Sequence, residues 1–120
     1  MSQIIVVDDD AANAMLIQML LEMDGYATVA CQTAKEAEEA ITPDTAVFIV
    51  DVNLARGLSG IDLLQRIRSD QTKASSEAIV IMTSGDQRRE TDCHSAGANS
   101  FLLKPYAPNK LSEHIKELLT

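Results

Sequence analysis

The chain has 120 residues and a formal net charge of −8 at pH 7, and 46% of its residues are hydrophobic while only 3% are aromatic. This length fits one domain with an aliphatic core, and the negative charge argues against direct binding of nucleic acid, which requires clustered Lys and Arg. No apolar stretch is long enough for membrane insertion and the N-terminal apolar run is too short for a signal peptide, so we expect a single cytoplasmic domain over residues 1–120.

The first half of the chain alternates between short apolar runs and helical patterns. An uninterrupted aliphatic run at 4–7 predicts a strand buried on both faces. A helix is predicted at 11–23, followed by a second strand at 26–30. Thr33 has capping-box spacing and begins a second helix. A third apolar strand is predicted at 46–50.

The second half continues the same alternation. In order, the pattern predicts a helix at 61–68, a strand at 78–82, a helix at 87–96, a strand at 100–103 and a last helix that begins at Pro108 or Asn109. The helix at 87–96 carries almost no apolar side chain, so we predict that it is marginally held and forms the mobile part of a switch. The first helix is the opposite case. Met15, Met19 and Met23 form a stripe at helical spacing that is predicted to pack in the core, and Leu16, Leu20 and Met23 are predicted to lie on one side of the helix.

Five strands alternating with five helices predict an α/β fold, with a parallel sheet covered by helices on both faces. In such sheets a site lies beyond the carboxyl ends of the strands, near the point where the strand order reverses. In the order 2-1-3-4-5 the first and third strands are neighbours. Residues that directly follow these two strands would therefore converge.

Reactive side chains stand at the ends of four of these strands. They are Asp8 and Asp9 after the first, Asp51 after the third, Thr83 after the fourth and Lys104 after the fifth. Two carboxylates about 4 Å apart repel by roughly 4 kcal/mol at an effective dielectric near 20, so the aspartates need a cation or a shared proton. Oxygen ligands with room for water suit Mg²⁺, while an ammonium and a hydroxyl suit phosphoryl oxygens. The set is typical of phosphoryl transfer onto a carboxylate.

Four segments, IIVVDDD, VFIVDVNL, IVIMTSG and FLLKP, resemble in order and spacing the receiver domain of two-component response regulators of the chemotaxis-regulator-like type. The resemblance covers essentially the whole chain. It implies a flavodoxin-like (βα)5 fold with a parallel five-stranded sheet of order 2-1-3-4-5. It also implies a phospho-accepting switch that modifies itself and turns over no external substrate.

The resemblance assigns roles to individual residues. Asp51 would be the phosphoacceptor, Asp9 would bind Mg²⁺ directly and Asp8 would act mainly through a coordinated water. The backbone carbonyl of Asn53 would complete the protein's share of the metal site, in which Mn²⁺ is expected to substitute for Mg²⁺.

The resemblance also indicates which residues surround the phosphoryl group. Thr83 and Lys104 would contact it, and Phe101 matches an aromatic switch position that turns inward when Thr83 is drawn toward the phosphate. The Lys104–Pro105 peptide bond would be cis. Gly85 leaves no side chain to shield the phosphoryl group, which favours a phosphoaspartate lifetime that is not unusually long.

The expected partners are a histidine kinase or histidine phosphotransfer protein as phosphodonor, and a downstream protein target or effector domain bound through the fourth helix, fifth strand and fifth helix. Alternatives remain open: a receiver fragment of a larger transcription factor or hybrid kinase, or a phosphorylation-independent pseudo-receiver. A dehalogenase-type phosphatase would need a second carboxyl where Asn53 stands. An FMN-binding flavodoxin would have its phosphate repelled by the aspartates after the first strand.

Overall fold

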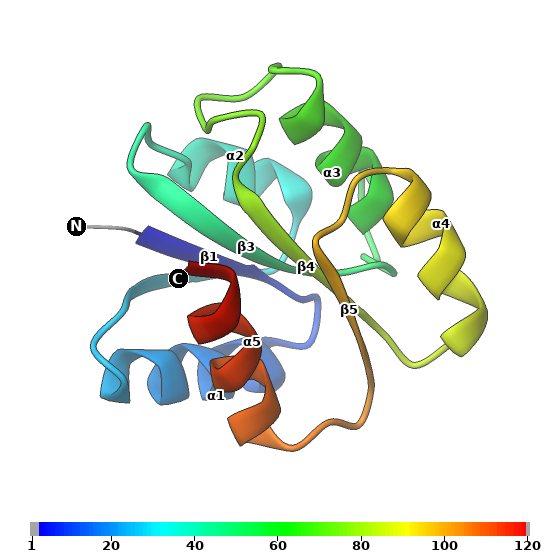
Figure 1. Cartoon of the computed structure of the whole chain (residues 1–120). Coiled ribbons are helices and arrows are strands. Elements are labelled where there is room, and N and C mark those ends of the chain that lie inside the picture. Colours follow the sequence, from blue (N-terminus) through cyan, green and yellow to red (C-terminus); the bar gives the residue numbers. More distant parts are fainter. Residues whose placement is uncertain (1–2, 120) are drawn as a thin grey trace.

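The computed structural model describes residues 3–119, which form one parallel sheet flanked by two layers of helices (Figure 1). The strands are β1 Gln3–Val7, β2 Ala27–Cys31, β3 Thr45–Asp51, β4 Ile79–Ser84 and β5 Ser100–Leu103. The helices are α1 Ala11–Met23, α2 Ala34–Ala40, α3 Gly60–Arg68, α4 Glu90–Ser95 and α5 Pro108–Leu119, with a 3₁₀ turn at Gln87–Arg89 before α4. Strand order is β2-β1-β3-β4-β5, as predicted.

Alternate residues of the central strands pack against opposite helical layers. Ile4 and Val6 of β1 belong to a cluster with α1 and α5, whereas Ile5 and Val7 belong to a second cluster with α2, α3 and Cys93 of α4. Both faces of the sheet are therefore buried against helices. This explains why the strands are continuous aliphatic runs and do not alternate between apolar and polar residues.

Side-chain caps fix where the helices begin. Asp10 accepts from the backbone N–H of Asn13 and so caps α1, as its position after β1 suggests. Thr33 caps α2 in the same way. Ser59 and Asp62 form a complete capping box at the start of α3. Because these caps lie at the carboxyl end of the sheet, they also set the geometry of the loops that carry the reactive side chains.

The prediction that the methionine stripe of α1 packs in the core is wrong. Ala14, Ile17 and Leu21 are the buried residues of this helix, at 2%, 5% and 1% exposure, while Met19 and Met23 are 58% and 81% exposed. Met15, the third methionine of the stripe, is also exposed, and so is Leu16. Since α1 is apolar on nearly every side, its sequence has no polar face that would show which side meets the sheet.

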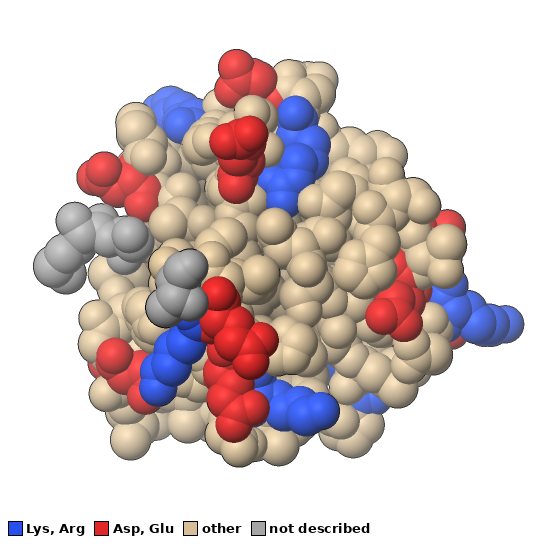
Figure 2. All heavy atoms as spheres, in the orientation of Figure 1, with Lys and Arg blue, Asp and Glu red and all other residues tan. Residues whose placement is uncertain are grey.

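Charges are interspersed on the visible surface. On the face shown in Figure 2, Lys and Arg side chains stand singly among Asp and Glu side chains rather than in one basic patch. Among the described residues, none of the helices has the length and apolarity that a membrane span requires.

Candidate functional site

Parallel pairing of β1 with β3 brings the predicted aspartates together. Val7 of β1 is the register partner of Val50 of β3. The next residues, Asp8 and Asp51, therefore lie side by side where the two strands end. One carboxylate oxygen each from Asp8, Asp9 and Asp51 lies within 4.8 Å of the others. Asp8 is 3% exposed and Asp51 is 9% exposed, whereas Asp9 faces solvent. The cluster therefore has a buried base and an open mouth.

Lys104 spans the two buried carboxylates. Its Nζ donates to Asp8 Oδ2 at 3.0 Å and to Asp51 Oδ2 at 3.2 Å. It reaches them from the end of β5, which pairs with β4. The Lys104–Pro105 bond is cis, as the resemblance implied. A single ammonium thus faces several carboxylates, and the site keeps an excess of negative charge.

Burial and this charge excess shift two pKa values. Burial raises the pKa of the Asp51 carboxyl above its usual value; the Lys104 charge opposes that shift, and the Asp8 carboxylate adds to it. Burial alone would lower the pKa of Lys104, but its hydrogen bond to Asp8 and the charges of both carboxylates outweigh burial and raise it. Lys104 is therefore held as a cation, while Asp51 carries its negative charge at some electrostatic cost.

Asp8 is held by more than the lysine. Its Oδ1 accepts from the backbone N–H of Asp10 at 3.0 Å, and its Oδ2 accepts from Asn13 Nδ2 at 2.6 Å in addition to Lys104. The sequence predictions did not include Asn13. Its place in the first turn of α1, five residues after Asp8, is the signal that could have identified it.

The other predicted residues lie around Asp51. Thr83 is its register partner on β4 and is 2% exposed. The backbone N–H of Asn53 donates to Asp51 Oδ1 at 3.2 Å, which orients the carboxylate, while the Asn53 side chain faces solvent. Phe101 pairs in register with Met82 of β4 and is half-buried, packed against the core cluster beneath α3 and α4.

The donor set fits a hard divalent cation. The clustered ligand atoms are all carboxylate oxygens, which Mg²⁺ prefers, and the exposed position of Asp9 leaves room for retained waters. Cys31 and Cys93, which would favour a softer metal, are both buried elsewhere as free thiols. The chemistry of the residues present therefore suits Mg²⁺.

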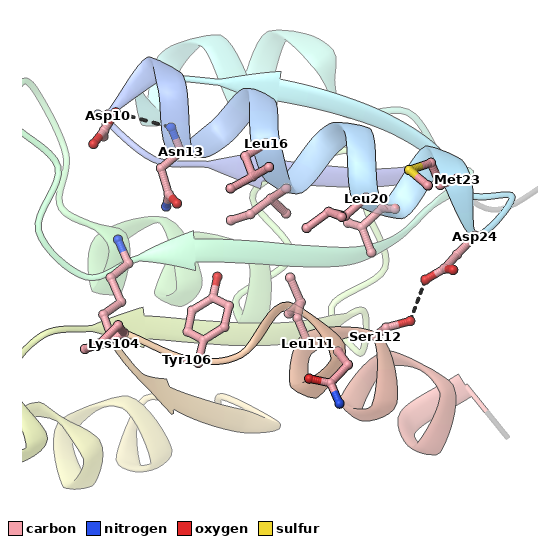
Figure 3. Close-up of a pocket in the computed structure, with 14 residues that line it drawn as sticks. Asp10, Asn13, Leu16, Leu20, Met23, Asp24, Lys104, Tyr106, Leu111 and Ser112 are labelled. Atoms are coloured by element: carbon pink, nitrogen blue, oxygen red, sulfur yellow. Dashed lines mark hydrogen bonds between the residues drawn. The ribbon is translucent and has the colours of Figure 1, made fainter.

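A mainly apolar groove of about 760 Å³ lies between α1 and α5 and opens beside the site (Figure 3). Lys104 and Asn13 line the end near the aspartates, and Asp24, hydrogen-bonded to Ser112, lines the far end. The Tyr106 hydroxyl points toward α1 and is buried without a hydrogen-bond partner among the described residues, and burial raises its pKa.

Comparisons with known proteins agree with this architecture. The family model described as response regulator receiver domain matches residues 4–116. The chain is 32% identical over 119 residues to the sensory/regulatory protein RpfC of Xanthomonas campestris, a match that covers 97% of this chain but only 16% of that protein. It is 31% identical over 120 residues to chemotaxis protein CheY1 of Helicobacter pylori, covering 98% and 96% of the two chains. A CheY-like receiver domain structure from Methanospirillum hungatei superposes with a TM-score of 0.86 at 28% identity, covering 99% of this chain and 94% of that one.

Proposed function

Because the chain belongs to the response regulator receiver domain family of two-component systems, we propose that it accepts a phosphoryl group on Asp51 with Mg²⁺ bound by the neighbouring aspartates. The observation that carries this proposal is the placement of Lys104 Nζ within hydrogen-bonding distance of both Asp8 and Asp51. An ammonium held between the metal-site carboxylate and the phosphoacceptor is placed to neutralise a phosphoryl oxygen.

In the proposed reaction, an Asp51 carboxylate oxygen attacks the phosphorus of a phosphohistidine. The P–O bond forms as the P–N bond breaks, and the electron pair returns to the imidazole, which takes up a proton. Lys104 and the Thr83 hydroxyl contact the phosphoryl oxygens, while the backbone N–H of Asn53 keeps the Asp51 carboxylate oriented. Bound Mg²⁺ would supply charge neutralisation for the phosphoryl group; Asp9, Asp8, Asp51 and the Asn53 carbonyl would hold it.

The proposed phosphodonor is a histidine kinase or a histidine phosphotransfer protein, with small acyl phosphates as substitutes. The match to RpfC accords with a kinase partner, since that relative is described as a sensory/regulatory protein. This chain spans about a sixth of RpfC and nearly all of CheY1. Its relatives thus include a much longer protein and one of about its own length, which accords with either a receiver within a longer protein or a stand-alone regulator.

The proposed output is a change in the face formed by α4, β5 and α5, which binds a downstream target or effector domain. Thr83 and Phe101 would couple it to the site, because Thr83 lies beside Asp51 and Phe101 lies on the next strand, β5. Modification and demodification of Asp51 are self-catalysed in this scheme, and the protein acts on no external substrate. We propose that this switch works in the cytoplasm.

The test is incubation with acetyl phosphate and Mg²⁺, followed by intact-mass measurement. The wild type is expected to gain the mass of one phosphoryl group, and Asp51→Asn to gain none. Asp44→Asn is the matched control, because it removes an exposed carboxylate just before the opposite end of the same strand. It should be modified like the wild type, and chelation of Mg²⁺ should abolish modification of both.

An unmodified wild type under these conditions, with a folded state confirmed by circular dichroism, would contradict the proposal and favour the pseudo-receiver alternative. Equal modification of wild type and Asp51→Asn would place the phosphoryl group on a different residue.

A further inference from the structure

We propose that Asn13 is a positioning residue of the metal site, which orients the Asp8 carboxylate and keeps it hydrogen-bonded when Lys104 turns toward a phosphoryl group. This inference rests on the proposed function, since it concerns how Asp8 serves Mg²⁺ binding. It adds to the site a residue from α1 that neither the metal cluster nor the phosphoryl contacts include.

The position of Asn13 is fixed by its own backbone. Its N–H donates to the Asp10 side chain at 3.2 Å as part of the α1 cap, so its side chain leaves the first turn in a set direction. Its Nδ2 donates to Asp8 Oδ2 at 2.6 Å, the shorter of the two side-chain contacts to that oxygen. Figure 3 shows the Asn13 amide and the Lys104 ammonium pointing toward one another from α1 and the end of β5.

Asp8 depends on such donors because water has little access to it. The residue is 3% exposed, and its described hydrogen bonds come from the Asp10 N–H, Asn13 and Lys104. Lys104 is shared with Asp51, so any movement of its Nζ toward a phosphoryl oxygen lengthens its contact with Asp8. Asn13 would then be the remaining side-chain donor to Oδ2, and a buried carboxylate oxygen would otherwise be left unpaired.

The chemistry of an amide suits this role. A second ammonium in this place would also orient Asp8, but it would neutralise the charge that attracts Mg²⁺. Asn13 is uncharged, so it fixes the carboxylate and leaves its negative charge available to the cation. Groups that hydrogen-bond to a metal-site carboxylate typically change metal affinity by about 10–100-fold when removed.

The test compares two amide-to-leucine changes on the same helix. Asn13→Leu removes the donor to Asp8. Gln18→Leu is the matched control, because Gln18 is also a half-buried amide on α1, but its Nε2 donates to the Thr28 carbonyl, away from the aspartates. Mg²⁺ binding to the unphosphorylated proteins is measured by titration calorimetry. We expect about tenfold weaker binding for Asn13→Leu and wild-type binding for Gln18→Leu.

A second measurement separates positioning from a general loss of structure. The rate of phosphorylation by acetyl phosphate is measured against Mg²⁺ concentration. The half-saturating Mg²⁺ concentration should rise about tenfold in Asn13→Leu. The rate at saturating Mg²⁺ should change by a smaller factor than the half-saturating concentration does. Asn13→Ala, a change that helices tolerate well, takes its place if the leucine variant does not fold.

Other results would overturn either the role of Asn13 or the proposed function. Equal Mg²⁺ affinity in Asn13→Leu and the wild type, or equal weakening in Gln18→Leu, would overturn the inference and leave the proposed function intact. A lowered maximal rate with an unchanged half-saturating Mg²⁺ concentration would also overturn it. If the folded wild type itself bound no Mg²⁺, the proposed function would fail.

Discussion

Gly60 approaches Asp51 so closely that a β-carbon at position 60 would lie 2.1 Å from the Asp51 carbonyl oxygen. Gly60 is the first residue of α3, and its N–H donates to the Val52 carbonyl at 3.0 Å. The start of α3 therefore rests directly on the backbone of the proposed phosphoacceptor. This contact holds the end of β3 in place while the loop between them extends into solvent.

Gly60→Ala is expected to destabilise the fold, because the two atoms nearest to the new β-carbon belong to the Asp51 backbone and cannot rotate away. We expect a loss of about 2–3 kcal/mol in the free energy of unfolding, measured by urea denaturation. Gly85→Ala is the control, since a β-carbon there meets no atom within 4 Å, and it should stay within about 0.5 kcal/mol of the wild type. Equal stabilities for Gly60→Ala and the wild type would show that α3 can shift without cost.

Asp51→Asn is expected to raise the melting temperature of the protein in EDTA at pH 7. Because the folded state raises the pKa of Asp51 above its ordinary value of 3.8, the stability linked to its proton is complete below that value and is lost as pH rises through the folded pKa. The variant has no such loss. We expect a difference of a few degrees, on the scale of roughly 1 kcal/mol for a domain of this size.

The same linkage predicts that this advantage narrows toward about pH 4, where the wild-type carboxyl regains its proton. Adding Mg²⁺ at pH 7 should stabilise the wild type more than the variant. Melting curves across pH, with and without the metal, test both statements. An advantage of Asp51→Asn that stayed constant down to low pH would rule out the charge as its cause.

The orientation of α1 predicts opposite results for two nearby substitutions. Ile17→Ala should cost about 2–4 kcal/mol, because this side chain is 5% exposed and packs under the sheet. Met19→Lys should change stability by less than about 0.5 kcal/mol, because Met19 is 58% exposed. Denaturation of both variants measures this directly. A large loss of stability in Met19→Lys would indicate that Met19 packs in the core, as its helical spacing suggested.

A large side chain at position 85 should lengthen the life of the phosphoaspartate. Gly85 is exposed and lies two residues beyond Thr83, and a β-carbon at this position would have open space around it, so an arginine there can extend over the mouth of the site. We expect Gly85→Arg to slow hydrolysis several-fold by shielding the phosphoryl group from water. Loss of label from the phosphorylated protein measures the rate, and an unchanged half-life would refute the shielding argument.

The segment 87–95 is expected to exchange its amide hydrogens faster than α5. Cys93 is the single buried residue of α4, whereas α5 buries both Leu111 and Ile115 at 3% or less exposure. Local opening therefore exposes little apolar surface in α4 and much more in α5. Hydrogen exchange followed by mass spectrometry compares the two segments. Equal protection would contradict a mobile α4.

Several features of the protein follow from its sequence alone. The continuous aliphatic runs predicted strands buried on both faces, and the sheet confirms them. The close approach of Asp8, Asp51 and Lys104 could be predicted because each directly follows such a run, and parallel strands end at one edge of the sheet. These are properties of local pattern and chain order, which a sequence displays directly.

Other features were decided only by the tertiary structure. Which side of α1 meets the sheet depends on packing, because a helix that is apolar on nearly every side has no polar face to mark its outer side. The bond from Asn13 to Asp8 and the close approach of Gly60 to Asp51 depend on how a helix is seated against a strand end. Such contacts arise from side-chain direction and backbone separation in three dimensions, and the linear pattern of residues fixes neither.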